Sequence, residues 1–292
     1  MRRNDAPPAA QGVAMSRGEN FPVASLLVRR RSRRLMAAFY DFARAADDVA
    51  DDPVLPSGEK LARLDRFEAG LDLAPEGEPY GVELARVLIA DDRGGATIHA
   101  RALLGAFRQD AVRTRYASWD DLVDYCRMSA DPVGRFILDI HDEAPATYGP
   151  SDALCTVLQV LNHMQDLRAD YRDLDRVYLP RDMMQAAGCT PADLDRDAAS
   201  PGLRAAIDAT LDLTDGLLAQ AALLPGRLTS RRLAGEVRVI LVIARRLSAR
   251  LRAGDPLATR IKPARGDVVR AFAAGIGTAL GPRRAGTARV SA

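Results

Sequence analysis

Two aspartates near residue 50 have the spacing of a pair of metal ligands. Asp47 and Asp51 lie four residues apart in the segment ARAADDVADDP, and Asp48 and Asp52 repeat that spacing. In a helix, side chains four residues apart share one face, where two like charges repel each other. Mg²⁺ reverses this preference, because it binds carboxylate oxygens and commonly shares them with substrate phosphates. The first aspartate motif, Asp47 with Asp51, therefore predicts an Mg²⁺ site; the alternative is a solvated acidic helix end before Pro53.

A second set of polar residues follows one helical stripe in the segment LQVLNHMQDLRADY. Gln159, Asn162, Asp166 and Asp170 are separated by three, four and four residues, and at about 100° per residue they fall on one side of a helix. Two carboxylates and two amides in an apolar helix need partners if they are buried. The second aspartate motif, Asp166 with Asp170, therefore predicts a metal cluster facing the first across a cavity that holds a diphosphate. The solvent face of a helix is the alternative.

A third segment, YCRMSADPVGRF at 125–136, predicts a break between two helices. Pro132 and Gly134 stand two residues apart within an otherwise helical pattern, with Tyr125 before them and Arg135 directly after. Proline and glycine together commonly kink or end a helix. Such a break leaves backbone groups free to face a cavity, and an ordinary turn between helices is the alternative.

The elements that must position these side chains are helical almost throughout. Apolar residues recur at spacings of three and four from Leu26 onward, and no sustained alternation predicts a strand. Residues 151–171 contain no helix breaker and predict one long helix, and 237–243 predict a buried helix. We expect one all-α domain of roughly eight to ten helices at 18–280, a disordered segment at 1–17 and a loose tail at 281–292.

Composition limits the classes of protein and partner. Hydrophobic residues make up 48% and charged residues 27% of the 292, which excludes a disordered or disulfide-scaffold protein. The net charge of +2 predicts no nucleic-acid partner. Three cysteines without a CxxC pair and three histidines indicate a cytoplasmic protein without a zinc ribbon. No signal-peptide pattern and no membrane-spanning run occur. The basic cluster Arg29–Arg34 predicts peripheral lipid contact, or a solvated face.

Four segments taken together resemble the squalene/phytoene synthase family. They are ENFPVAS at 19–25, YDFARAADDVAD at 40–51, YCRMSADPVGR at 125–135 and LQVLNHMQDLRADYRDLDRVYLP at 158–180. The resemblance extends from about residue 18 to about residue 265. Within the family, ENFPVAS and Gln165 are similar to the bacterial hydroxysqualene synthase branch.

The resemblance implies an isoprenoid-synthase bundle of helices around a central cavity. It implies Mg²⁺ held by Asp47, Asp51, Asp166 and Asp170, and ionisation of presqualene diphosphate with capture of water to give hydroxysqualene. Further catalytic residues would be Tyr40 and Asn162. Substrate-binding residues would be Phe21, Arg44, Tyr125, Arg135, Gln159 and Tyr178. Other enzymes of the same pathway are expected partners.

Other reactions and other classes of protein stay open at this point. Within the family, the alternatives are condensation of two farnesyl diphosphates and squalene synthesis with NADPH. An HD-type phosphohydrolase is suggested by His99, His141-Asp142 and Asp166 in that order. A non-catalytic assembly factor on the same fold is disfavoured, because all four aspartates are present. The loop 172–176 departs from the family pattern through its added acids, and the match at 260–265 is faint.

Overall fold

The computed structural model describes residues 30–280, which form twelve α-helices and three short 3₁₀ helices. This all-α fold was predicted, but the helices outnumber the eight to ten expected. Two of the additional helices have only six and four residues, which is too short for a helical period to show in the sequence. The α-helices are α1 (Arg30–Asp51), α2 (Ser57–Leu71), α3 (Pro79–Ala90), α4 (Thr97–Asp110), α5 (Trp119–Ser129), α6 (Asp131–Ile140), α7 (Tyr148–Leu174), α8 (Arg181–Ala186), α9 (Pro201–Ala221), α10 (Leu224–Arg227), α11 (Arg231–Ala253) and α12 (Arg265–Leu280).

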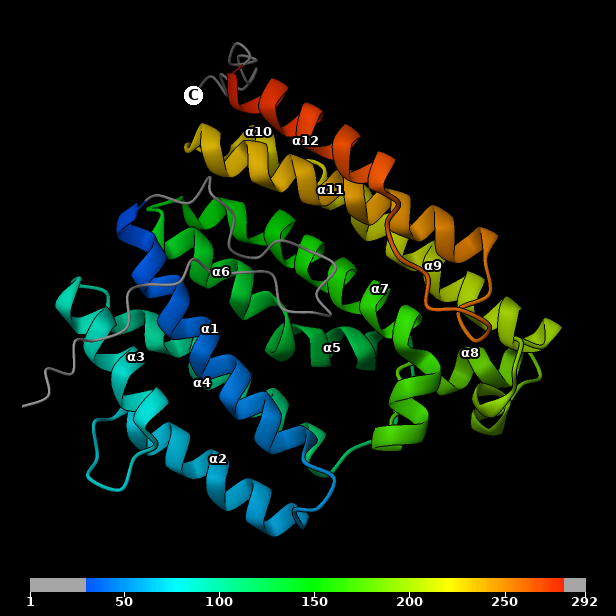
Figure 1. The fold of residues 1–292 in the computed structure, drawn as a ribbon, viewed down its shortest axis with the longest axis horizontal. Helices are drawn as coiled ribbons and strands as arrows, with labels where there is room; N and C mark the ends of the chain where they lie inside the picture. The colour runs from blue at the N-terminus through cyan, green and yellow to red at the C-terminus, as the bar shows by residue number, and fades with distance from the viewer. Residues whose placement is uncertain (1–29, 281–292) are drawn as a thin grey trace, which may run out of the picture.

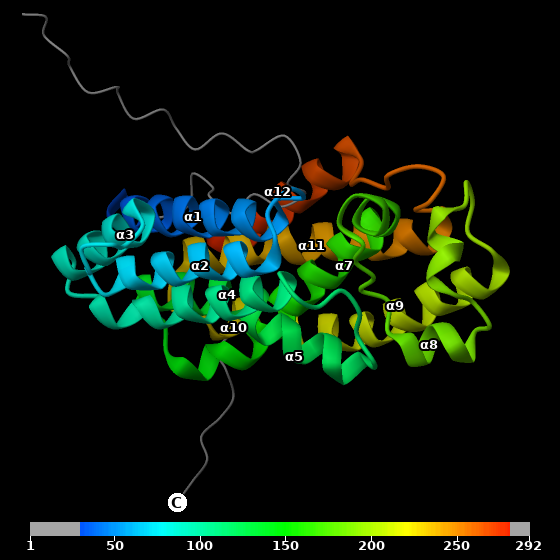
Figure 2. The same cartoon turned by 90° about the horizontal axis from the view of Figure 1, so that it is seen from below.

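The helices form two groups joined through α7. Helix α1 packs against α2, α3 and α4, whereas α7 packs against α6, α9 and α11, and α12 lies along α11 at the outer edge (Figures 1 and 2). Each group has its own buried core. Phe42 and Leu64 are fully buried in the first group, and Leu161 and Met164 are fully buried in the second. The two aspartate motifs therefore lie on helices from different groups.

Helix α1 buries one face and ends at the first aspartate motif. Phe39, Phe42 and Ala46 pack into the core. The helix stops at Asp51, and the carboxylate of Asp52 accepts hydrogen bonds from the backbone N–H groups of Val54 and Leu55. The expected second pair, Asp48 with Asp52, is therefore not a helical pair. Asp52 serves instead to turn the chain, a common role for aspartate.

The predicted long helix is confirmed as α7, which covers 148–174. Its stripe of Gln159, Asn162, Asp166 and Asp170 is partly exposed, while Leu154 and Leu161 on other sides are buried. The predicted buried helix at 237–243 is confirmed within α11. The break between α5 and α6 at Ala130 is confirmed as well.

The long helix predicted at 151–171 begins three residues earlier than expected. Residues 145–147 form a 3₁₀ turn, but α7 already begins at Tyr148 and contains Pro150 in its first turn. Proline is tolerated there because the first backbone N–H groups of a helix have no partner within it. Within 30–280, no helix is long and apolar enough to cross a bilayer. The predicted segments 1–17 and 281–292, Phe21 and Arg29 lie outside the described residues.

Candidate active site

The first aspartate motif occupies the last turn of α1. Arg44 lies one turn before it, with a guanidinium nitrogen 3.8 Å from the carboxylate of Asp47 and another 3.2 Å from that of Asp48. Burial, reinforced by the neighbouring Asp51 carboxylate, raises the pKa of Asp47 to about 7. Tyr40, seven residues before Asp47, is partly exposed on the same side of α1. The motif thus concentrates negative charge that a cation would neutralise.

The second aspartate motif lies near the end of α7, where the linker between α11 and α12 covers it. Arg260 donates a hydrogen bond of 2.8 Å to the carboxylate of Asp166, whose pKa is raised by burial. The carboxylate of Asp170 is 3.9 Å from Nδ1 of His163. Gln165 is buried and donates to the carbonyl of Ile261. Gln165 therefore fixes the linker rather than facing the carboxylates, and this bond holds Arg260 beside Asp166.

Arg176 connects the two motifs. It follows α7 directly, its side chain is 7% exposed, and its Nη1 donates to Asp51 at 2.5 Å. Its Nη2 donates to the carbonyl oxygens of Ala50 and Asp110, at 3.4 and 3.3 Å. The left-handed backbone of Asp175 (φ 50°) ends α7 and turns the chain toward α1. One buried guanidinium thus ties the end of α1 to the end of α7.

A buried aromatic group fills the space behind this arginine. Tyr125 donates to the carboxylate of Asp110 at 2.8 Å, and burial raises the pKa of Asp110 to about 7. Tyr178 stacks on His163, with ring centroids 3.4 Å apart, and lies 5.8 Å from the ring of Tyr125. Burial also raises the pKa of both tyrosines, which keeps their hydroxyls protonated. Two predicted binding residues, Tyr125 and Tyr178, therefore meet between the aspartate motifs.

Arg135 does not join this group. It makes a two-bond ion pair with Asp152 on α7, at 2.9 and 2.6 Å, and its guanidinium lies 5.2 Å from the ring centre of Tyr148. Asp152 precedes Asp166 by fourteen residues, which is roughly 21 Å along a helix. The structure therefore places Arg135 away from the second motif. Gln159 and Asn162 lie between these points on α7, on the side of Asp166.

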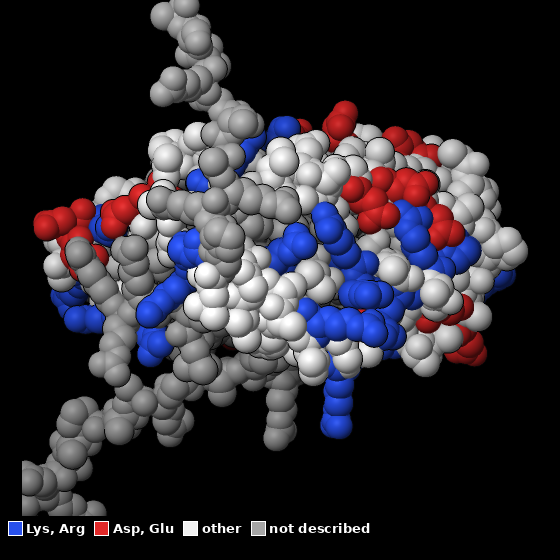
Figure 3. Space-filling model, turned by 90° about the horizontal axis from the view of Figure 1, so that it is seen from above, with Lys and Arg blue, Asp and Glu red and all other residues white. Residues whose placement is uncertain are grey.

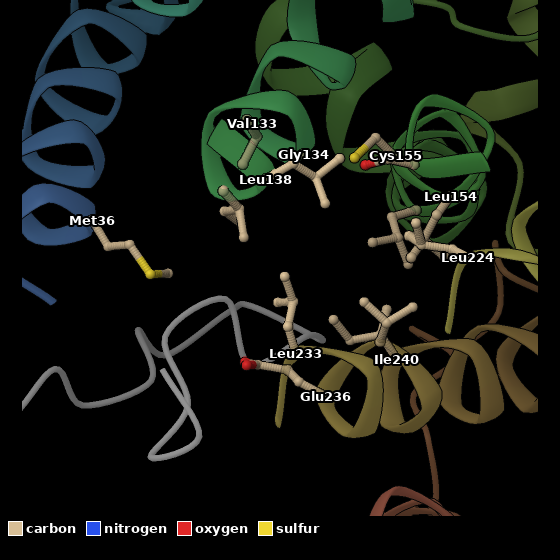
Figure 4. A pocket seen from close by; sticks show the side chains of 14 residues that line it. Met36, Val133, Gly134, Leu138, Leu154, Cys155, Leu224, Leu233, Glu236 and Ile240 are labelled. Carbon is tan, nitrogen blue, oxygen red and sulfur yellow. The ribbon is translucent and has the colours of Figure 1, made fainter. Parts of the chain in front are cut away.

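An apolar cavity of about 110 Å³ lies farther along α7. Met36, Leu138, Leu233 and Ile240 point toward this space from α1, α6 and α11 (Figure 4). Among the lining residues, Glu236 carries the one ionisable acid, and it is buried. Leu158 also lines the cavity, eight residues or roughly 12 Å before Asp166 on the helix. An apolar molecule in this cavity could extend toward the aspartates.

The carboxylates of the two motifs fit an Mg²⁺ ion that is bound jointly by protein and substrate, rather than an ion enclosed by protein ligands alone. Within 30–280, no three His, Cys, Asp or Glu side chains gather closely enough to hold a metal by themselves. Each motif instead offers two carboxylates, and the pKa of Asp47 is raised mainly by burial and further by the neighbouring Asp51 carboxylate. Mg²⁺ commonly uses one or two carboxylates and completes its octahedron with waters and substrate phosphates.

The residues of the phosphohydrolase alternative do not converge. His99 contacts Asp139 at 2.7 Å, and His141 contacts the carbonyl of Ile137. Asp142 pairs with Arg93 at the surface, at 2.5 Å. Because Asp166 pairs with Arg260 on the other side of the molecule's core, this ordering of His and Asp is a coincidence of sequence.

Comparison with known proteins agrees with the fold. The model of the squalene/phytoene synthase family matches residues 15–267, so the chain belongs to that family and is an isoprenoid synthase. It is 45% identical over 245 residues to the hydroxysqualene synthase of Rhodopseudomonas palustris, covering 84% of this chain and 83% of that one. It is 44% identical to the hydroxysqualene synthase of Zymomonas mobilis, covering 83% and 82%.

A solved structure shows the same helical arrangement. The crystal structure of squalene synthase HpnC from Alicyclobacillus acidocaldarius superposes with a TM-score of 0.69 at 33% identity, covering 80% of this chain and 88% of that one. Family membership excludes the phosphohydrolase alternative.

Sequence reasoning missed four residues that hold the site together: Asp110, His163, Arg176 and Arg260. Arg176 and Arg260 were visible only as basic residues at weak points of the family match. Asp110 has no spacing signal, because its partners Tyr125 and Arg176 are 15 and 66 residues away in the chain. His163 lies seven residues before Asp170 on α7, but its neighbours in sequence did not mark it as part of a site. A search for buried charges could have found them, but burial is not readable from one sequence.

Proposed function

We propose that this chain is a hydroxysqualene synthase, converting presqualene diphosphate and water into hydroxysqualene and inorganic diphosphate. The observation that carries the proposal is its 43–45% identity over most of its length to relatives named hydroxysqualene synthase. The geometry supports it in two ways. The buried Arg176 pairs with Asp51 and donates its backbone N–H to the carbonyl oxygen of Asp170, and an apolar cavity lies farther along α7.

The first step breaks the carbon–oxygen bond between the hydrocarbon and the diphosphate. The diphosphate oxygen keeps the electron pair, and a carbocation remains. We assign Asp47, Asp51, Asp166 and Asp170 as the residues that would hold Mg²⁺, which when bound neutralises the charge of the departing diphosphate. Arg44 and Arg260 lie beside these carboxylates and can add charge-assisted hydrogen bonds to the same anion.

The second step joins the carbocation to one water molecule. The water oxygen forms the new bond to carbon and loses a proton, so the product is an alcohol. Asn162 and Gln159 are the amides nearest Asp166 on the α7 stripe. An amide can donate to and accept from a water without adding a permanent charge. We therefore assign Asn162 to orienting the water, and the aromatic face of Tyr40 to stabilising the cation.

The hydrocarbon arms of the substrate need an apolar space. The cavity beside Leu138, Leu154 and Ile240 is lined mainly by aliphatic side chains, with Ser151, Cys155 and Glu236 as its polar members, and it starts roughly two helical turns before Asp166. We place one hydrocarbon arm of the substrate there. Substrate and product both dissolve in lipid, so we place the enzyme in the cytoplasm at the membrane surface. The enzyme that makes presqualene diphosphate would be its pathway partner.

The test is incubation of the purified chain with labelled presqualene diphosphate and Mg²⁺ in the absence of NADPH. We expect release of diphosphate and a single alcohol. Squalene formed only with NADPH would make the chain a squalene synthase instead. Consumption of farnesyl diphosphate without consumption of presqualene diphosphate would assign it to the condensing reaction. Loss of all activity on either substrate would favour a non-catalytic role.

A further inference from the structure

The last described helix, α12, carries an exposed apolar stripe that the proposed function does not use. Val269, Phe272, Ile276 and Leu280 follow one another at spacings of three, four and four residues, and so share one side of the helix. Their exposed fractions are 69%, 45%, 58% and 82%. Single exposed apolar side chains are ordinary on protein surfaces, but a continuous exposed patch marks an interaction site.

The exposed charges on the helix that carries this stripe are basic. The single acid of α12, Asp267, is buried and accepts a hydrogen bond of 2.8 Å from Arg250. Arg265 and Arg270 are exposed on α12, and Lys262 is exposed on the linker before it. The chain beyond Leu280, GPRRAGTARVSA, adds three arginines and no acid. Figure 3 views the side that carries α11 and α12, where Lys and Arg gather beside an uncharged area.

Helix α11 separates this stripe from the apolar cavity. One side of α11 supplies Leu233, Val237 and Ile240 to the cavity lining. Another side meets α12 so closely that a methyl group added to Gly235 would lie 2.9 Å from the carbonyl oxygen of Gly275. Figure 1 shows α12 outside α11 along its length. A surface bound to the stripe would therefore be separated from the cavity by α12 and α11.

We propose that the Val269–Leu280 face of α12 docks on an anionic lipid surface, with its apolar side chains in the headgroup–acyl boundary. An apolar stripe between basic residues is the pattern of helices that lie in this boundary, and anionic lipid attracts the arginines. A contact between two copies of this face would instead bring the exposed Arg265 and Arg270 to a helix whose single acid, Asp267, is already buried and paired, so the arginines would find no exposed acid on α12. The benefit to catalysis rests on the proposed function, since only a lipid-soluble substrate or product gains from such docking.

Flotation with lipid vesicles tests the docking surface. Purified full-length protein is mixed with phosphatidylcholine vesicles, with and without phosphatidylglycerol, and the floating fraction is measured. The variant Phe272→Glu/Ile276→Glu changes the stripe. The matched control Ile89→Glu/Ile98→Glu adds the same charge at exposed isoleucines of α3 and α4, which are 55% and 65% exposed. We expect wild type and control to float with the anionic vesicles and the stripe variant to lose about tenfold in bound fraction.

A second measurement keeps the inference testable if the double variant folds poorly. Trp119 is the single tryptophan of the chain, so Phe272→Trp adds a reporter on the stripe. We expect anionic vesicles to shift its emission to the blue and brominated lipid to quench it, compared with wild type. Unchanged emission would overturn the proposal.

The remaining outcomes are also decisive. No flotation of the wild type, or equal flotation of the stripe variant, would overturn the docking of α12; the second result would move lipid contact elsewhere, for example to Arg33 and Arg34. A wild-type dimer that the stripe variant dissociates, without vesicle binding, would make the face a contact between copies and overturn the proposal. Turnover of detergent-dispersed presqualene diphosphate is measured in parallel. Flotation without turnover would contradict the proposed function but still support the docking of α12 on lipid.

Discussion

Asp47 is the residue at which the proposed metal chemistry can be followed directly. Burial and the adjacent Asp51 raise the pKa of its carboxyl to about 7, so near neutral pH this group is partly protonated. Mg²⁺ binds the carboxylate form and must displace that proton. We predict that apparent Mg²⁺ affinity, in the presence of substrate or a diphosphate, rises with pH from about 5 to about 7 and then levels off. Calorimetry in two buffers of different ionisation enthalpy measures the released proton.

The variant Asp47→Asn is the control for that measurement, because its amide has no proton to lose in this range. A proton release that persists in Asp47→Asn would assign the titration to another group, such as Asp110, whose pKa is also about 7. Affinity independent of pH in the wild type would contradict the assignment of Asp47 as a ligand.

Both aspartate motifs should be needed for turnover, and neither for folding. We predict that Asp47→Asn and Asp166→Asn each lower turnover by about a hundredfold or more, with helicity unchanged by circular dichroism. The physical reason is that each removes a charge that faces the diphosphate, while neither fills a core position. Exposed aspartates of the same helices give the controls Asp41→Asn and Asp173→Asn, which should retain activity. Normal turnover of either motif variant at saturating Mg²⁺ would refute the two-motif site.

Arg176 should contribute to stability as well as to the site. We predict that Arg176→Gln lowers the free energy of unfolding by about 2 kcal/mol, because a buried guanidinium loses its charged hydrogen bond to Asp51. Arg172→Gln in the same segment is the control. Its ion pair with Asp195 is about half exposed on both sides, so water and salt screen it and it should contribute much less to stability than Arg176 does. Urea denaturation compares the two variants. Equal losses of stability would show that the buried ion pair of Arg176 stabilises the fold no more than an exposed one.

The residue scale also shows where prediction from sequence stops. Asp47, Asp51, Asp166 and Asp170 were found because helical spacing alone places each pair on one face. Their link through Arg176 was not found, because Arg176 and Asp51 are 125 residues apart in the chain. Family resemblance suggested Arg135 as a diphosphate contact. In the structure that arginine is paired with Asp152, so the prediction of its role is not supported by its position.

At the scale of elements, the crossing of α11 and α12 depends on two glycines. A methyl group at Gly275 would lie 2.5 Å from a side-chain carbon of Val239 and 2.7 Å from the carbonyl oxygen of Gly235. The second contact is with backbone and cannot relax by rotation of a side chain. We predict that Gly275→Ala destabilises the protein by about 1–3 kcal/mol and increases amide hydrogen exchange in α12.

Gly277 on the same helix gives a control, for which we expect the opposite change in stability. An added methyl group there meets nothing within 4 Å, and alanine is the better helix former, so Gly277→Ala should stabilise by up to about 1 kcal/mol. Equal effects of the two substitutions would show that the crossing is not set by close packing at Gly275.

Long elements were predictable and short ones were not. The helix α7 was expected because 151–171 contains no breaker, and the break between α5 and α6 was expected from Pro132 and Gly134. Helices α8 and α10 have six and four residues, too few for a period of 3.6 to show. The start of α7 was misplaced because Pro150 resembles a breaker, although its position in the first turn makes it compatible with the helix.

At the scale of the whole molecule, the two carboxylate pairs come from the two groups of helices, and an apolar cavity lies farther along α7. Helix α1 supplies one pair and α7 the other, and the buried cluster of Arg176, Asp110, Tyr125, Tyr178 and His163 fills the region between them. Sequence predicted that both pairs would serve one diphosphate, and resemblance predicted a cavity at the centre of the bundle. The apolar cavity beside α7 agrees with that expectation of a dry hydrocarbon site, while its continuity with the aspartates stays a prediction.

The source of the product's oxygen tests the central claim most directly. Presqualene diphosphate, Mg²⁺ and the purified enzyme are incubated in water enriched in ¹⁸O, without NADPH, and the product is analysed by mass spectrometry. The account predicts an alcohol that carries ¹⁸O in proportion to the enrichment of the water. The reason is that the original carbon–oxygen bond is broken and the oxygen of a water molecule bonds to the carbocation. An alcohol with unlabelled oxygen would mean cleavage between oxygen and phosphorus, and a hydrocarbon as the main product would mean that water is excluded. Either result would contradict the account.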